Sequence, residues 1–510
     1  MNINLLQYFE QTVAKNPNKV AVKEGANSLD FKTLQWKAKS VASYIKAQTN
    51  HRFNAPIAVF LPKSIDCVTA DMAATYSGNA YMNLDIKAPS NRIFNIISLI
   101  EPAVIITRTE YIATLPEVSS DIFLIDLNEV DYNNPEAEKD MLTDLMDNII
   151  DTDPYCIINT SGSTGTPKGV VLNHKSFFDF TDWSIETFQF NEDEVIGSLS
   201  PQVFDIYSFE LCLLITKGST IVLIPDGLAA FPVKIIELLQ REKVTFLFWV
   251  PTIMVNIANM NLLSNVELPD MRIVWFAGEV FPTKQFNYWK KQLGHTKFVN
   301  LYGPIEITLD CTYFVVDRDV PDDEPLPIGI PCRNTSVLVL NDEDKPIGKD
   351  EEGELCIRGT SLAMGYYNNP EKTAAAFVQN PLNKSYPEII YRTGDVVSFN
   401  DRGEIVFKGR KDTLIKHLGY RIELGEIEHV IVNVLQMVKN CCVVYHTAKK
   451  EITTIYESHE DIADGVFRIK LLEHFPKYMI PSRYIRMDEL PRNTNGKIDR
   501  FTLKNSVNEN

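Results

Sequence analysis

Thr160-Ser-Gly-Ser-Thr-Gly-Thr-Pro-Lys168-Gly169 is the stretch from which the fold and the chemistry of this chain are inferred. Its glycines let the backbone approach an anion closely, its hydroxyls donate to phosphate oxygens, and Lys168 adds a positive charge. Apolar runs at 155–159 and 169–172 predict two strands joined by this loop. The spacing differs from the GxxxxGK[ST] motif, so this is not a P-loop. The stretch predicts a polyphosphate-binding loop between strands, although by itself it also fits a flexible surface loop.

Strand and helix patterns alternate over the first 400 residues, which predicts an α/β architecture. Pro56–Leu61 is expected to be a buried strand that is followed by a helix over Ser64–Tyr76. From about residue 400 the pattern changes to mixed α+β, after a hairpin turn at 401–404 and the charged stretch 409–412. We therefore expect two domains, 1–409 and 410–510.

The composition is that of an ordinary globular protein, with 45% hydrophobic and 23% charged residues among 510. The net charge of −17 argues against nucleic acid or an anionic membrane as a partner. Eight cysteines without a CxxC pair are expected to be reduced and mostly buried. The N-terminus lacks the pattern of a signal peptide, and no apolar run is long enough to cross a membrane. A cytoplasmic location fits these features best.

Three short motifs carry further polar groups. Tyr302-Gly-Pro-Ile-Glu306 follows the expected strand 297–301, at an edge where ligands of open α/β sheets collect. Tyr391-Arg-Thr-Gly-Asp395 places a carboxylate after a turn, suited to ribose hydroxyls, and Asn495-Gly-Lys497 places a cation near the C-terminus. Taken singly, these motifs also fit a turn with a solvated Glu, an Asx-type turn and a surface Lys.

In this order and spacing the motifs resemble those of the adenylate-forming superfamily. The resemblance extends from about residue 5 to Arg500 and is greatest to amino-acid adenylation domains of nonribosomal peptide synthetases and to D-alanine–carrier protein ligase. It implies a large N-terminal domain of stacked β-sheets and helices, a small mobile C-terminal domain, and an active site between them. The implied reaction uses ATP and Mg²⁺ to form an acyl adenylate, and a phosphopantetheine thiol of a carrier protein then displaces AMP.

The resemblance also implies residue roles. The β- and γ-phosphates would be held by the loop from Thr160 to Lys168, which includes Ser161, Gly162, Ser163, Thr164 and Gly165. Glu306 would bind Mg²⁺, Tyr302 would pack against adenine, and Asp395 and Arg410 would hold the ribose. Lys497 would bridge the substrate carboxylate and the α-phosphate, and Asp412 matches the hinge of the small domain. Lys497, Glu306 and Lys168 are thus the expected catalytic residues.

The substrate pocket implied by the resemblance begins at Asp205, which matches the residue that pairs with an amino acid's α-ammonium. A helix-capping role is the alternative for this Asp. The other matching positions are Ile206, Phe209, Phe248, Trp275, Ala277, Leu301, Leu309 and Asp310. Three aromatic side chains among them predict a small substrate side chain, whereas Asp310 favours a polar or cationic one unless it points away.

Two positions depart from the family pattern. Ile305 replaces the usual Thr before the Glu and so removes a hydroxyl near the α-phosphate, and Asn159 stands where Tyr or an aliphatic residue is common. A downstream carrier segment is absent from the sequence, so the thiol acceptor is expected to be a separate carrier protein or coenzyme A. The leading interpretation is an amino acid–carrier protein ligase. A small-acid acyl-CoA synthetase and a non-catalytic nucleotide-binding homologue are the alternatives.

Overall fold

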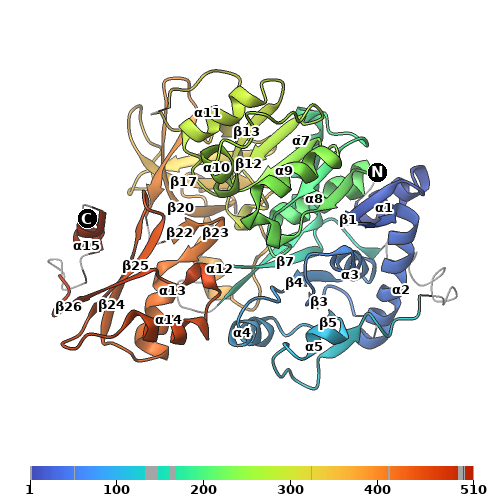
Figure 1. Cartoon of the computed structure of the whole chain (residues 1–510), viewed down its shortest axis with the longest axis horizontal. Helices are drawn as coiled ribbons and strands as arrows, with labels where there is room; N and C mark the ends of the chain where they lie inside the picture. The colour runs from blue at the N-terminus through green and yellow to red at the C-terminus, as the bar shows by residue number, and fades with distance from the viewer. Residues whose placement is uncertain are drawn as a thin grey trace.

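The fold is a layered α/β structure, as the alternating pattern predicts (Figure 1). The computed structural model describes residues 3–50, 52–132, 148–160, 167–322, 324–411, 414–491, 498 and 500–508. Two large, mostly parallel sheets are followed along the chain by smaller, mostly antiparallel ones. The predicted fold class is therefore confirmed.

The first large sheet contains the strands on both sides of the Gly-rich stretch. Its described strands follow the order β18-β8-β7-β4-β3-β5-β6, in which β7 and β8 are antiparallel and pair Thr160 with Lys168. These strands are β3 (Pro56–Val59), β4 (Ala80–Asn83), β5 (Val104–Thr107), β6 (Phe123–Asp126), β7 (Pro154–Thr160), β8 (Lys168–Asn173) and β18 (Gly365–Tyr366).

The second large sheet supplies most of the strand ends that reach the site described below. Its described strands follow the order β15-β14-β13-β12-β11-β9-β10-β1-β2, and those from β13 to β1 are parallel. The strands are β1 (Val20–Glu24), β2 (Asn27–Asp30), β9 (Val195–Ser198), β10 (Thr220–Leu223), β11 (Phe246–Trp249), β12 (Ile273–Phe276), β13 (Lys297–Tyr302), β14 (Thr312–Val315) and β15 (Ile330–Pro331).

Helices lie between the two sheets and on their outer faces (Figure 1). The central layer includes α3 (Ile65–Tyr76) and α8 (Asp205–Lys217), and every residue of α8 up to Ile215 is buried. Apolar side chains on all sides of α8 explain this, since an amphipathic helix would leave one face in water. One core cluster joins both sheets through this layer. The other described helices before residue 300 are α1 (Leu5–Lys15), α2 (Phe31–Thr49), α4 (Ser90–Ile100), α5 (Thr109–Ile112), α7 (His174–Phe188), η2 (Asp226–Ala230), α9 (Pro232–Arg241), α10 (Pro251–Asn259) and α11 (Thr283–Gln292).

A third sheet and a C-terminal lobe complete the chain. The third sheet consists of β16 (Thr335–Leu340), β17 (Gly353–Gly359), β19 (Phe377–Gln379), β20 (Ile389–Phe399) and β21 (Ile405–Arg410), with η3 (Ile305–Ile307) before it and α12 (Pro370–Ala376) within its connections. The C-terminal lobe, defined here as the elements from β22 onward, has its own core cluster. It contains β22 (Leu414–His417), β23 (Tyr420–Glu423), α13 (Leu424–His429), η4 (Val430–Val434), β24 (Asn440–His446), β25 (Glu451–Glu457), α14 (Asp464–Leu472), η5 (Lys477–Met479), β26 (Arg483–Met487) and α15 (Arg500–Asn508).

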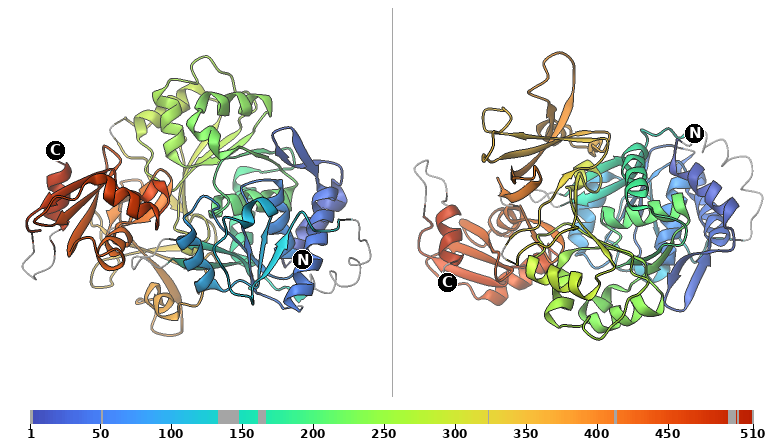
Figure 2. Two further views of the ribbon diagram at one scale, coloured as in Figure 1. Left: turned by 60° about the horizontal axis from the view of Figure 1, so that its bottom comes forward. Right: turned by 90° about the horizontal axis from the view of Figure 1, so that it is seen from above.

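Figure 2 shows the C-terminal lobe (red) at the end of the molecule opposite α1 and α2 (blue). All eight cysteines are buried and unpaired, as expected from the sequence. In the part of the chain that the structure describes, no helix is both long and apolar enough to cross a membrane.

Candidate active site

A cavity of about 1000 Å³ opens where strand ends of the second sheet meet the C-terminal lobe. Its walls include residues shortly after the ends of β9, β11, β12 and β13, together with residues of the β22–β23 turn. The carboxyl ends of parallel strands converge on this point, which is where open α/β sheets bind their ligands. The expected location of the site, next to Tyr302, agrees with this cavity.

The turn after β13 places Glu306 in the protein interior. Gly303 allows this turn because a Cβ there would lie 2.2 Å from the Leu309 carbonyl oxygen. Glu306 lies in η3 and is fully buried, and its Oε1 accepts a hydrogen bond of 2.9 Å from the Tyr366 hydroxyl. Lys168 Nζ lies 5.0 Å from the centre of the Tyr366 ring. The structure thus brings Lys168 and Glu306, two expected catalytic residues, to either side of one tyrosine.

Tyr366 was not predicted as a site residue. It lies in the short strand β18, which pairs with β8, the strand that begins at Lys168. Its sequence context, Gly365-Tyr-Tyr367, contains no signal that distinguishes it from a core aromatic residue.

Tyr302 and Asp395 contact each other directly. The Tyr302 hydroxyl donates a hydrogen bond to Asp395 Oδ2, and both residues line the cavity. Burial, together with the negative charge of Asp395, raises the pKa of Tyr302 well above its usual value, so the phenol stays protonated and donates. Asp395 in β20 is opposite Arg410 in β21. Tyr302 and Asp395, expected to contact adenine and ribose, therefore lie together in the cavity wall.

Asp205 starts α8 and borders the same cavity. One of its carboxylate oxygens accepts a 3.2 Å hydrogen bond from the Leu309 amide. Burial raises the pKa of Asp205 to about 6, while this hydrogen bond and the positive charge of Lys416 act in the opposite direction. Leu309 and the preceding Thr308 both have positive φ angles, 66° and 55°. The backbone is therefore held in a strained conformation at the residue that contacts Asp205.

Asp310 is a second buried acid close to Asp205. Burial is the main cause that raises its pKa well above the usual value; the negative charge of Asp205 raises it further, and Lys416 partly opposes both. Lys416 is on β22 and lies 5.8 Å from the centre of the Tyr302 ring. This lysine was not predicted, because its stretch, 414–417, looks like an ordinary strand.

The predicted pocket residues divide into two groups. Of these positions, Asp205, Ile206 and Leu301 line the cavity. The others are buried and do not line it: Phe209, Phe248, Trp275, Ala277, Leu309 and Asp310. Phe209 and Trp275 are stacked with their ring centres 5.2 Å apart, and Phe248 meets Trp275 edge-on at 5.3 Å. These three rings pack against one another in the interior instead of lining the cavity.

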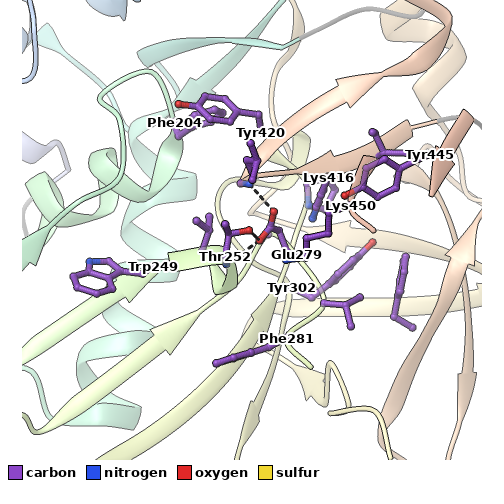
Figure 3. Close-up of a pocket in the computed structure, with 18 of the residues that line it drawn as sticks. Phe204, Trp249, Thr252, Glu279, Phe281, Tyr302, Lys416, Tyr420, Tyr445 and Lys450 are labelled. Atoms are coloured by element: carbon purple, nitrogen blue, oxygen red, sulfur yellow. Dashed lines mark hydrogen bonds between the residues drawn. The ribbon is translucent and has the colours of Figure 1, made fainter. Parts of the chain in front are cut away.

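Glu279, which follows β12, is a further cavity residue that the sequence did not indicate. It accepts hydrogen bonds from the amide and hydroxyl of Thr252 and from the Gly419 amide of the C-terminal lobe (Figure 3). In Figure 3 it lies near Lys416 and Tyr302. Glu279 therefore connects the strand ends of the second sheet with the lobe.

Ile305, which replaces the usual Thr, lines the cavity, whereas Thr308 does not. The Thr308 hydroxyl is buried and has no hydrogen-bond partner among the described residues. Several predicted residues lie outside the part of the chain that the structure describes: Ser161, Gly162, Ser163, Thr164, Gly165, Asp412 and Lys497, and likewise the side chain of Arg410. Their roles remain predictions.

Glu306 fits a magnesium ligand. Mg²⁺ in phosphate-binding sites usually takes one or two carboxylates and completes its shell with phosphate oxygens and water. No group of three His, Cys, Asp or Glu side chains suited to a metal occurs among the described residues. A single buried carboxylate beside Lys168 matches a site that holds Mg²⁺ only together with a nucleotide.

Solved structures of similar fold confirm the architecture. The adenylation domain AlmE from Vibrio cholerae, solved with glycyl-adenosine-5'-phosphate, aligns with a TM-score of 0.84 and 20% identity over 100% of this chain and 98% of its own. The o-succinylbenzoate CoA synthetase MenE from Bacillus subtilis aligns with a TM-score of 0.81 and 18% identity over 98% of each chain.

Curated relatives are similar over the whole length. Gramicidin S synthase 2 of Aneurinibacillus migulanus is 31% identical over 507 residues, which cover 98% of this chain and 11% of that protein. The chain thus spans only about a tenth of that relative. Zwittermicin A synthase ZmaJ of Bacillus cereus is 28% identical over 512 residues, 99% of this chain and 95% of its own length. A family model described as AMP-binding enzyme matches residues 9–367, most of the chain. The resemblance inferred from the motifs is confirmed: the chain belongs to the AMP-binding enzymes, the ATP-dependent adenylate-forming ligases that include the adenylation domains of nonribosomal peptide synthetases.

Proposed function

We propose that this enzyme activates a small amino acid with MgATP and transfers the aminoacyl group to the phosphopantetheine thiol of a separate carrier protein. The observation that carries the amino-acid half of the proposal is Asp205, a buried carboxylate at the edge of the cavity. An ionised carboxylate in such a place is stabilised by a cation, and an α-ammonium group supplies one. A fatty or aryl acid carries no ammonium group to pair with Asp205.

The proposed reaction begins with attack of the substrate carboxylate on the α-phosphate of ATP. Tyr302 and Asp395 would bind the adenosine, with Arg410 completing the ribose site. Lys168 and the loop before it would hold the β- and γ-phosphates. Mg²⁺ held by Glu306 would neutralise phosphate charge. The side chains in this proposal act by alignment and electrostatic stabilisation, and none of them forms a covalent intermediate.

The same proposal assigns residues outside the described part of the chain. Lys497 would neutralise the charge that builds up between the attacking carboxylate and the α-phosphate. Asp412 would be the hinge about which the small domain, 410–510, turns against the large domain, 1–409, between adenylation and thiol transfer.

A small substrate side chain is supported by the packing around Asp205. Phe209, Phe248 and Trp275 are fully buried, with Phe209 stacked on Trp275 and Phe248 edge-on to it, and none of them lines the cavity. Glycine, alanine or serine would fit without displacing these rings.

The relatives support an amino acid and a carrier as the two partners. AlmE was solved with a glycyl adenylate, and PA1221, a protein of nonribosomal peptide synthesis with adenylation and PCP domains, has a TM-score of 0.82 to this chain. ZmaJ, matched over 95% of its length, is about the size of this chain.

The decisive experiment is ATP–pyrophosphate exchange with each L- and D-amino acid, with short fatty and aryl acids in the same panel. We expect a strong signal with one or a few small amino acids. A signal only with a non-amino acid would contradict the proposal and favour an acyl-CoA synthetase. If none of the acids supports exchange although the protein still binds ATP, the non-catalytic alternative is favoured.

Asp205→Asn and Asp71→Asn form a matched pair for this assay. Both carboxylates are buried, but Asp71 accepts its hydrogen bonds from Tyr207 and Asn83 and does not line the cavity. We expect Asp205→Asn to reduce amino-acid-dependent exchange by about a hundredfold while ATP binding is retained, because a buried charged pair is lost. Asp71→Asn should leave exchange close to the wild-type rate.

A further inference from the structure

Two polar contacts of charged side chains join the C-terminal lobe to the rest of the described chain. Arg92 of α4 forms an ion pair with Glu426 of α13, at 3.1 Å between Nη1 and Oε1. The side chains of this pair are 13% and 1% exposed. On the other contact, Glu279 Oε1 accepts a 2.5 Å hydrogen bond from the Gly419 amide (Figure 3). A buried ion pair and a charge-assisted hydrogen bond therefore join the same two parts of the molecule.

The two contacts reach one short segment of the lobe from different layers. Arg92 belongs to a helix that packs on the first large sheet, and Glu279 follows β12 of the second. Both hold the segment 419–426, which includes β23. Asn91, next to Arg92, adds a 3.3 Å hydrogen bond to the Glu473 carbonyl just after α14, and Figure 1 shows α4 beside α13 and α14.

The segment 419–426 forms part of the cavity wall. Gly419 has a positive φ of 83°, and a Cβ there would lie 2.8 Å from Val250, so the turn packs tightly on the cavity wall. Tyr420 meets Phe204 edge-on at 5.7 Å and stacks on Tyr478 at 3.5 Å. In this arrangement Lys416, Gly419 and Tyr420 all line the cavity.

We propose that Arg92 and Glu279 are positioning residues that hold the C-terminal lobe in the arrangement described here, which serves one of the two half-reactions and not the other. The inference rests on the proposed function, in which Lys497 acts in adenylation and the lobe turns about Asp412. Arg92 and Glu279 precede that hinge, whereas Gly419 and Glu426 follow it. Any turn of the lobe about the hinge therefore has to break both contacts.

Breaking the Arg92–Glu426 pair is costly because it separates a charge from its partner at a nearly inaccessible position. Removing one partner of a buried pair leaves the other uncompensated, which is more damaging than loss of an exposed pair. Loss of Arg92 thus disfavours the observed arrangement specifically. Once the lobe has turned away, Arg92 no longer contacts Glu426, so loss of Arg92 should not change the stability of that second arrangement.

The test measures the two half-reactions separately in Arg92→Gln. The two half-reactions are ATP–pyrophosphate exchange and single-turnover transfer from preformed adenylate to pantetheine. The one that uses the arrangement held by Arg92 should fall at least about tenfold, while the other should stay within about twofold of wild type. The charge-reversed pair Arg92→Glu with Glu426→Arg should recover the half-reaction that fell. Equal loss in both half-reactions, or no loss in either, would overturn the proposal.

Arg108→Gln is the matched control. Arg108 forms an ion pair of 2.7 Å with Asp66, with 29% and 26% of the side chains exposed, and both residues precede the hinge. Its loss should change neither half-reaction relative to the other. A loss confined to the same half-reaction in this variant would show that the effect is general destabilisation.

A distance measurement tests, without any enzymatic activity, whether Arg92 holds the C-terminal lobe in the observed arrangement. Fluorophores on Met260→Cys and Ile469→Cys, both exposed and on opposite sides of the interface, report the position of the lobe by energy transfer. The native cysteines are all buried, which limits background labelling. Arg92→Gln should change the transfer efficiency, and an unchanged value would overturn the inference. If no amino acid supports exchange, the proposed function fails, and this measurement still decides the role of Arg92.

Discussion

Gly303→Ala should disrupt the amino-acid site. A Cβ at Gly303 would lie 2.2 Å from the Leu309 carbonyl oxygen and 2.5 Å from the Asp310 Cα. Both neighbours are backbone atoms, so no side chain can rotate away. Leu309 also donates through its amide to Asp205, which ties the clash to the proposed ammonium site.

The size of the effect follows from the overlap. Non-bonded heavy atoms are in favourable contact at about 3.5 Å, so the 2.2 Å approach requires a backbone shift on the order of 1 Å. A displacement of about 1 Å at a reacting site can cost about a hundredfold in rate. Overpacking typically lowers the free energy of unfolding by about 1–3 kcal/mol. We therefore expect a large catalytic loss in a protein that still folds.

The assay is amino-acid-dependent ATP–pyrophosphate exchange, with kcat/KM determined separately for the amino acid and for ATP. Gly465→Ala is the control, because a Cβ there meets nothing within 4 Å and the residue lies in the first turn of α14. It should keep wild-type exchange and stability. Wild-type kcat/KM for the amino acid in Gly303→Ala would refute the idea that this close approach positions the Leu309 amide and Asp205.

Three further outcomes are expected. Because the pKa of Asp205 is raised to about 6, the KM for the amino acid should rise about tenfold for each pH unit below 6 and be constant above pH 7, while the KM for ATP should not change in this way. A raised pKa in the folded state lowers the stability of the protein as the pH rises from about 4 to 6. Asp205→Asn should therefore melt at a higher temperature than wild type at pH 7.5 in a thermal scan. Trp275→Ala removes a fully buried ring stacked on Phe209, so it should destabilise the protein by about 3–5 kcal/mol in denaturant titration and extend exchange to larger amino acids. Tyr366→Phe removes the hydrogen bond to Glu306 but keeps the ring beside Lys168, so it should raise the Mg²⁺ concentration needed for half-maximal exchange more than the KM for the amino acid.

The layered fold could be predicted because its signals are local. The expected strand before the Gly-rich stretch is β7 and the one after it is β8, and the helix expected at Ser64–Tyr76 is α3 with Ser64 as its N-cap. Continuous apolar runs indicate buried parallel strands whatever their partners are. The order of the strands in the sheets depends on long-range packing, and no local pattern reports it.

The candidate site was predictable only in part, for a similar reason. Tyr302, Glu306 and Asp395 are in short motifs whose spacing is distinctive. Tyr302 and Asp395 line the cavity, and Glu306 is buried against Tyr366 without lining it. Tyr366 beside Glu306 and Lys416 in the cavity wall lie on strands that give no chemical signal in the sequence. Trp275 and Phe248 were expected to fill much of the pocket, but only the structure shows that they meet edge-on and do not line the cavity.

Lys416 links the charge of the amino-acid site to the position of the C-terminal lobe. Its positive charge lowers the pKa of Asp205 and of Asp310, and it is carried by β22, on the same lobe as the Arg92–Glu426 contact. Energetic coupling is reciprocal, so if Lys416 favours the ionised Asp205, then ionised Asp205 favours the arrangement that brings Lys416 close. A substrate ammonium group on Asp205 competes with Lys416 for the same negative charge. Binding of an amino acid should therefore weaken the attraction between Asp205 and Lys416 and so favour movement of the lobe. The Arg92–Glu426 pair lies outside the cavity, and the substrate should not change its strength.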